Sequence, residues 1–135
     1  MIKRLILLAS LLMSGECSAG NWTKLFSESG RSESLNESTL KYININRSGY
    51  WQAWARTEYE VPQKGVRKNE RFNALDTLMV VNCENGEYSF KSLIFRLNGT
   101  VIHSEEHSLD EIPFSSVPPD SITEIYFNKI CSLRP

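Results

Sequence analysis

The sequence LDTLMVVNCENGEYSFKSLIFRLNGTVIHS, residues 75–104, decides the fold class of this 135-residue chain. Its β-branched, aromatic and aliphatic residues form three runs, and each gap between the runs contains an Asn-Gly pair. The pair Asn98-Gly99 is typical of a type I′ turn, because both central residues of that turn need positive φ. Asn85-Gly86 indicates a second tight turn. The stretch therefore predicts three consecutive antiparallel strands, over 75–83, 88–97 and 100–104.

Three more strands are predicted upstream, over 22–26, 40–45 and 50–59. The turn residues between Asn46 and Gly49 join the last two strands into a hairpin. Along 50–59, Trp51 and Tyr59 share one side of the strand, while Tyr50 and Trp54 lie on the other.

Two segments between these strands are predicted to be irregular. Residues 27–38 are polar, rich in Ser and Glu and almost free of apolar residues, which is typical of a mobile surface connection. Residues 61–71 contain Pro62, Gly65 and a string of basic side chains, which predicts a loop.

The C-terminal residues predict the one helix of the chain, over Ser121–Cys131. Ser121 and Glu124 have the spacing of a capping box, and Pro118-Pro119 stops the helix from extending backward. Its apolar residues fall on one stripe, formed by Ile122, Ile125, Tyr126 and Ile130. The fold class expected from these elements is α+β: a small antiparallel sheet of about five to six strands with one C-terminal helix.

The first residues have the pattern of a signal peptide. Lys3 and Arg4 precede an apolar stretch over 5–13 and small residues at 18–20, and that stretch is too short to span a bilayer. We expect a signal peptide over 1–19 and one mature domain over 20–135. A second interpretation is lipoprotein processing before Cys17, although Ser14, Gly15 and Glu16 lack the expected Leu.

Cleavage after Ala19 leaves two cysteines, Cys83 and Cys131, in a chain bound for an oxidising compartment. We expect a disulfide between them, which would tie the helix end to the strand over 75–83 and stabilise the fold by about 4 kcal/mol. The alternative is two unrelated buried thiols.

The composition and motifs favour a binding or structural protein over an enzyme. The net charge is −1 and the pI is about 6.1, so there is no electrostatic case for nucleic acid. No phosphate-binding loop, dinucleotide fingerprint or Gly-x-Ser-x-Gly elbow occurs. We therefore expect no catalytic residues.

The cluster His103, Glu105 and His107 is the nearest approach to a metal site, since alternate residues of a strand point the same way. Further ligands are not identifiable, and the acidic neighbours Glu106 and Asp110 indicate an exposed turn. We therefore predict no metal site and no cofactor from the residues. An enzyme would require these two histidines to converge with acids in one cleft.

An ordered set of landmarks along the mature chain resembles the bacterial surface-adhesin protein E family. The resemblance covers nearly all of the mature chain and depends on the order of its members. They are Trp22, Tyr42-Ile43-Asn44, Gly49, Trp54, Tyr59, Cys83, Tyr88, Asn98-Gly99, and Val117-Pro118-Pro119-Asp120-Ser121 before a helix ending in Cys131.

The resemblance implies a small antiparallel sheet with a C-terminal helix linked by the two cysteines, displayed outside the inner membrane of a Gram-negative bacterium. The characterised member of the family contacts host matrix and serum proteins such as vitronectin, laminin and plasminogen, and has been associated with haem. A role for haem here rests on the resemblance alone. Without a lipid at Cys17, we expect the product to be periplasmic or secreted rather than anchored at the cell surface.

A protein-contact surface is predicted from exposed aromatic and basic residues, which dominate interface energetics. The candidates are Tyr50, Trp51, Tyr59, Lys64, Arg67 and Lys68. The alternative places the aromatic rings in the core, an assignment we favour for Trp54, and leaves the basic residues as a solvated face. A second function class is a periplasmic envelope structural or assembly component, or a small inhibitor, that acts through sheet-edge pairing.

Overall fold

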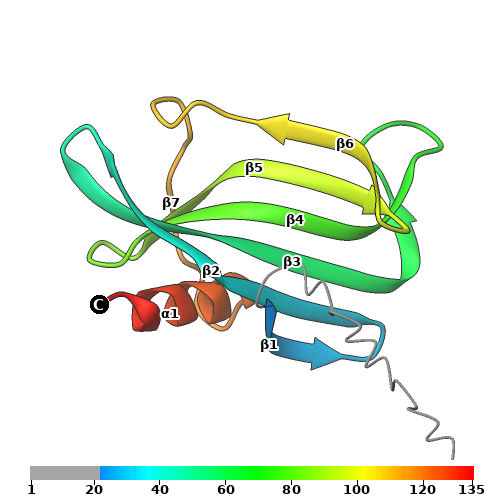
Figure 1. The fold of residues 1–135 in the computed structure, drawn as a ribbon, viewed down its shortest axis with the longest axis horizontal. Coiled ribbons are helices and arrows are strands. Elements are labelled where there is room, and N and C mark those ends of the chain that lie inside the picture. The colour runs from blue at the N-terminus through cyan, green and yellow to red at the C-terminus, as the bar shows by residue number, and fades with distance from the viewer. Residues whose placement is uncertain (1–21) are drawn as a thin grey trace, which may run out of the picture.

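A computed structural model describes residues 22–135 as one antiparallel sheet with a single helix packed against it (Figure 1). Six strands pair in chain order, each with the next, as a meander. They are β1 (Trp22–Glu28), β2 (Arg31–Ile45), β3 (Ser48–Lys64), β4 (Arg71–Asn82), β5 (Glu87–Leu97) and β6 (Thr100–Glu106). A two-residue strand, β7 (Ser115–Ser116), pairs with the start of β5. The predicted α+β fold class is confirmed.

The stretch over 75–104 forms β4, β5 and β6, as its turn signals predicted. Asn98 and Gly99 have φ values of 49° and 85°, and Gly86 has a φ of 68°. Glycine adopts these conformations without strain and asparagine does so more readily than most residues, which explains Asn98-Gly99 at one turn and Gly86 at the other. A register shift at Lys91 places Tyr88 and Phe90 on one face of β5 and Ser92 on the other, because Leu78 pairs with Ser92 but Met79 with Phe90.

The prediction of a mobile connection over 27–38 was wrong. Most of this segment belongs to β2, which pairs with β1 on one side and β3 on the other. Glu33, Ser34, Leu35 and Asn36 are buried. Two of the polar side chains have partners within the protein: Glu33 accepts a hydrogen bond from Tyr126 across 93 residues of sequence, and Asn36 accepts one from Ser38.

The loop predicted over 61–71 is shorter than expected. β3 continues to Lys64 and β4 begins at Arg71, so only 65–70 connect them. Pro62 can lie within β3 because the β3–β4 register shifts between Glu58 and Gln63, where the ladder is interrupted.

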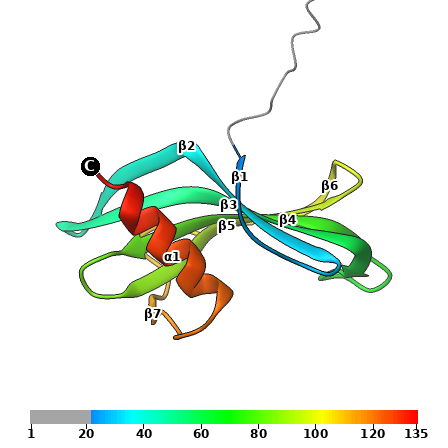
Figure 2. The same ribbon diagram turned by 90° about the horizontal axis from the view of Figure 1, so that it is seen from below.

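The predicted helix and disulfide are both confirmed. Helix α1 (Ile122–Leu133) begins after Ser121, whose Oγ accepts a hydrogen bond from the Glu124 amide at 3.1 Å. Cys131 near its end is bonded to Cys83, which follows β4. Figure 2 shows that α1 crosses one face of the sheet at the end that carries the C-terminus.

Apolar residues fill both faces of the sheet at that end. On the helix side, Tyr126 and Ile130 pack with a buried cluster formed by Leu35, Ala53, Ala55, Met79 and Val81. On the opposite side, Ile112 packs with Ile45 and Val80. Because Val80 alternates with Met79 and Val81, the central part of β4 is buried on both faces.

Within residues 22–135, no helix is long and apolar enough to span a membrane. The predicted signal peptide over 1–19 and Cys17 lie outside the described residues.

Candidate binding surface

The meander places three of its connections at one end of the sheet (Figure 1). We call this the distal end, formed by the β1–β2 turn at 29–30, the β3–β4 loop at 65–70 and the β5–β6 turn at 98–99. The opposite, proximal end carries the β2–β3 turn at 46–47 and the Cys83–Cys131 disulfide. A single strand such as β3 therefore supplies residues to both ends.

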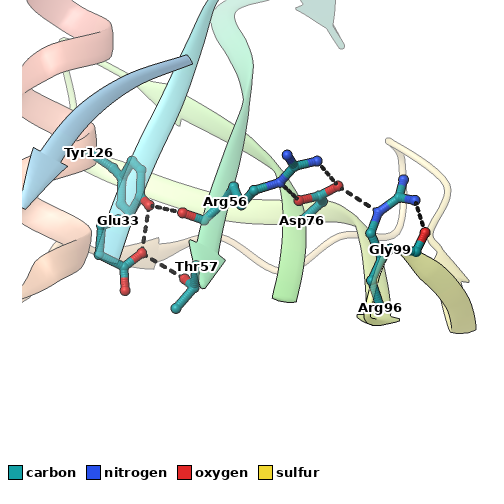
Figure 3. Close-up of polar contacts among 7 residues, drawn as sticks. All are labelled: Glu33, Arg56, Thr57, Asp76, Arg96, Gly99 and Tyr126. Atoms are coloured by element: carbon teal, nitrogen blue, oxygen red, sulfur yellow. Dashed lines mark hydrogen bonds and ion pairs between the residues drawn. The ribbon is translucent and has the colours of Figure 1, made fainter. Parts of the chain in front are cut away.

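A buried carboxylate fixes the helix on the sheet. Glu33 is 2% exposed, and its Oε2 lies 2.6 Å from both the Thr57 and Tyr126 hydroxyls (Figure 3). The Tyr126 hydroxyl also lies 3.1 Å from the Arg56 carbonyl oxygen. Burial, assisted by the hydrogen bond to Glu33, raises the pKa of Tyr126 far above its usual value. Tyr126 therefore remains a hydrogen-bond donor over the physiological pH range.

A second buried carboxylate joins three strands. Asp76 on β4 receives two hydrogen bonds from Arg56 on β3, at 2.6 and 2.9 Å, and one from Arg96 on β5 at 3.1 Å (Figure 3). The hydrogen bond to Asp76 raises the pKa of Arg56, and the guanidinium lies 4.2 Å from the centre of the Trp22 ring. Since both carboxylate oxygens are occupied by protein donors, the arrangement is a strand clamp rather than a reactive acid.

The histidine cluster converges on one carboxylate. Glu105 Oε1 lies 3.0 Å from His103 Nε2, and Glu105 Oε2 lies 3.9 Å from His107 Nε2. No group of three or more His, Cys, Asp or Glu side chains among residues 22–135 is arranged to hold a metal ion. The cluster pairs imidazole with carboxylate at the edge strand β6.

The predicted contact residues separate into two groups. Tyr50 and Trp51 lie near the proximal end on opposite faces: Tyr50 stacks on Phe114 with centroids 4.8 Å apart, and Trp51 meets Tyr42 edge-on at 5.2 Å. Trp51 also packs against the helix-side core. Trp54, for which the sequence favours a core position, is half-buried.

Tyr59, Lys64, Arg67 and Lys68 gather toward the distal end. Tyr59 contacts Phe72 edge-on with centroids 5.8 Å apart, and Phe72 is the second residue of β4, two positions after the loop ends. The loop and its two flanking residues, Lys64 to Arg71, line a depression of about 440 Å³. The structure thus brings four of the six predicted residues to one end of the sheet and leaves two at the other.

The four basic residues of the loop region are exposed and form no ion pair within the described part of the chain; they are Lys64, Arg67, Lys68 and Arg71. Two apolar side chains close to them in the sequence are also exposed, Val61 at 69% and Val66 at 56%, and Val66 lines the same depression. Sequence reasoning overlooked both valines, although an apolar residue within a basic loop is itself a signal for a contact surface. We call these six residues the distal surface.

The distal surface can bind a partner by charge and apolar contact. Its cations are solvated and have no carboxylate partner within residues 22–135. A complementary anion can therefore pair with them without breaking an ion pair in the protein. Its valines add apolar surface, and burial of that surface by a partner would contribute favourably to the binding free energy.

A comparison with family models identifies one match, described as Surface-adhesin protein E, over residues 22–132. The chain matches no curated protein and no solved structure. The matched segment spans every strand and nearly all of the helix, including both cysteines of the disulfide.

Proposed function

Because this chain belongs to the surface-adhesin protein E family, we propose that it is a non-enzymatic, extracytoplasmic binding protein of a Gram-negative bacterium. Its partners are host matrix or serum proteins, and its contact region is the distal surface with the neighbouring Tyr59. A surface-adhesin-like role follows from the family. The partner class and the contact residues are the proposal.

The main support for this proposal is a cluster of exposed cations, without ion pairs among the described residues, at one end of the sheet. Lys64, Arg67, Lys68 and Arg71 are exposed and lack ion pairs within residues 22–135. Other unpaired cations, such as Lys24, Lys41 and Arg47, are exposed but lie on separate elements. Clustered arginine beside apolar side chains is the composition that interface hot spots favour.

The paired strands β3, β4 and β5 form a rigid base for the distal end. Arg56 and Arg96 hold β3, β4 and β5 together through Asp76, and β3 and β4 continue directly into the loop. A loop held by two long paired strands loses less conformational freedom on binding than a loop on a mobile linker.

Export also supports the proposal. The Cys83–Cys131 disulfide persists in oxidising compartments, and residues 1–19 have the pattern of a signal peptide. We therefore place the mature protein, residues 20–135, in the periplasm or outside the cell.

The test is binding of the processed protein to immobilised vitronectin, laminin and plasminogen. The test variant is Lys64→Glu/Arg67→Glu/Lys68→Glu, and the matched control, with the same change in net charge, is Lys24→Glu/Lys41→Glu/Arg47→Glu. We expect the test variant to lose binding by about tenfold or more while the control keeps most of it. Equal losses would show that net charge alone governs binding and would remove the distal surface from the account.

The sheet edge favours one alternative, an envelope component that pairs with a partner strand. β1 pairs only with Arg31–Asn36, so Lys41–Ile45 of β2 have a neighbouring strand on one side only within the described residues. Because the two-residue turn makes Ile45 and Ser48 a hydrogen-bonded pair, the Asn44 amide points to the open side. Asn44→Pro should then abolish capture of an envelope partner, whereas the adhesin proposal expects it to leave host-protein binding intact.

A further inference from the structure

We infer that the polypeptide segment recognised at the distal end is acidic and amphipathic, with apolar side chains that reach a row of aromatic rings behind the basic loop. The inference rests on the proposed function and adds the chemistry of the partner. It depends on three observations: the row, its position relative to α1, and its place next to the cations along β3 and β4.

Four rings form a row toward the distal end, in which each ring contacts the next. The centroids of Tyr59 and Phe72 are 5.8 Å apart, those of Phe72 and Phe95 are 5.0 Å apart, and those of Phe95 and His103 are 5.6 Å apart. We call these four residues the aromatic row. Phe72 is buried, whereas the other three rings are half-buried and retain some contact with solvent.

The row lies on the helix side of the sheet but beyond the helix. Phe95 pairs with Leu75, and Leu75 pairs with Thr57, whose hydroxyl bonds the same Glu33 oxygen as Tyr126 of the helix. Paired residues project from the same face of a sheet, so Phe95 and Leu75 share the face that α1 covers elsewhere. Figure 2 shows that α1 does not extend to the β3–β4 loop. A partner can therefore approach this part of the face.

The cations begin one residue pair away from the row. Phe72 pairs with Gln63, and the next pair along the two strands is Arg71 with Lys64. Arg67 and Lys68 follow in the connecting loop, with Val66 beside them. The aromatic row and the unpaired cations therefore lie at the same end of the sheet, where adjacent residue pairs project from opposite faces.

This combination selects among partner chemistries. A basic segment would be repelled by the loop. A sulfated polysaccharide would pair with the cations but would leave the aromatic row and the valines without apolar partners. A segment with carboxylates on one face and aliphatic or aromatic side chains on another uses both features, since burial of apolar area adds to the charge pairs.

The experiment measures binding of fluorescent peptides to the processed protein by polarisation. One peptide alternates glutamate with leucine, a second replaces every leucine with serine, and a third replaces every glutamate with lysine. We expect the first peptide to bind about tenfold or more tightly than the second, because only the first supplies anchors for apolar contact. The third should not bind, and binding of the first should weaken steeply toward about 1 M salt, where the Debye length falls to about 3 Å.

Two variants assign the contributions to the surface. Lys64→Glu/Arg67→Glu/Lys68→Glu should weaken both acidic peptides, whereas Val61→Ser/Val66→Ser should weaken the first and leave the second unchanged. Each replaced residue is exposed, so the fold is expected to tolerate both changes. Lys24→Glu/Lys41→Glu/Arg47→Glu serves again as the charge control.

The outcomes separate this inference from the proposed function. Equal binding of the two acidic peptides and of a heparin oligosaccharide would overturn the inference in favour of a ligand recognised by charge alone. If no peptide binds while vitronectin, laminin or plasminogen still binds in a loop-dependent manner, the inference fails and the proposed function stands. If host-protein binding is insensitive to the loop variant, the proposed contact surface itself fails.

Discussion

The helix-covered half of the sheet and the distal end are built from the same strands, yet their charged side chains differ in burial and in partners. Under the helix, the buried carboxylate of Glu33 has hydroxyl partners on Thr57 and Tyr126. At the distal end, four exposed cations have no ion-pair partner within residues 22–135. The difference indicates that the first half holds the fold together, and that the second half is available for binding.

Strands β3 and β4 run through both halves of the sheet. These strands pass from the core under α1, through the Asp76 clamp, to the basic loop. Substitutions in the part of β3 or β4 under the helix should therefore destabilise the protein. Substitutions near the distal end should instead weaken binding.

Removal of the disulfide should have the largest effect. The bond closes a separation of 48 residues, and on the loop-entropy model its loss from Cys83→Ser/Cys131→Ser costs about 4 kcal/mol in the free energy of unfolding. Chemical denaturation of the oxidised protein and the variant measures the difference. A loss below about 1 kcal/mol would mean that packing of Tyr126 and Ile130 alone secures the helix.

Loss of the strand clamp should follow closely. Asp76→Ala leaves Arg56 and Arg96 without their shared carboxylate, and breaking such a pair costs about 3 kcal/mol when the arginines are partly exposed to water. Thermal unfolding is the measurement. Because the clamp braces β3, β4 and β5 below the loop, we also expect weaker host-protein binding in a folded sample.

Removal of the Tyr126 hydroxyl should have a smaller effect. Tyr126→Phe removes the hydroxyl that donates to Glu33 and also lies 3.1 Å from the Arg56 carbonyl oxygen, and it should cost about 1–2 kcal/mol. The matched control is Tyr42→Phe, since the Tyr42 side chain is exposed and lies outside the buried network.

The same hydroxyl predicts a change in stability at high pH. Burial raises the pKa of Tyr126 above its unfolded value of 10.0, so the folded state retains a proton that the unfolded state releases. Stability from this group is fully present below about pH 10 and declines as the pH rises further. The decline should be shallower in Tyr126→Phe; identical alkaline unfolding curves would contradict the buried hydrogen bond.

Variants of the distal surface should have the smallest effect on stability. Lys64→Glu/Arg67→Glu/Lys68→Glu changes exposed side chains without ion pairs, so the free energy of unfolding should shift by less than about 0.5 kcal/mol. Denaturation curves run beside the binding assays provide this measurement. A large loss of stability would show that the loop cations contribute to the fold.

Local signals in the sequence account for the elements that could be predicted. The Asn98-Gly99 turn, the Ser121 cap and the pairing of Cys83 with Cys131 each depend on a few neighbouring residues or on a simple count. The first half of β2 could not be predicted in the same way. Its buried Glu33 is compatible with a strand only because Tyr126 and Thr57 approach it in the folded protein.

The candidate surface was predictable in composition but not in grouping. Lys64, Arg67 and Lys68 stand out in the sequence, and so do Trp51 and Tyr59. Trp51 and Tyr59 are eight positions apart along an extended strand, which corresponds to about 26 Å, so the two rings cannot belong to one compact patch with the loop. Only the strand register shows that Phe72, Phe95 and His103 continue from Tyr59.

Hydrogen–deuterium exchange with and without bound vitronectin, laminin or plasminogen would locate the contact region on the sheet. Binding at the distal surface should slow exchange in the amides of 61–71 and around Phe95, while the amides of α1 and of Lys41–Ile45 exchange as in the free protein. Protection confined to the open edge of β2 or to the proximal residues near Tyr42 and Trp51 would contradict this prediction, because the partner would then avoid the distal surface.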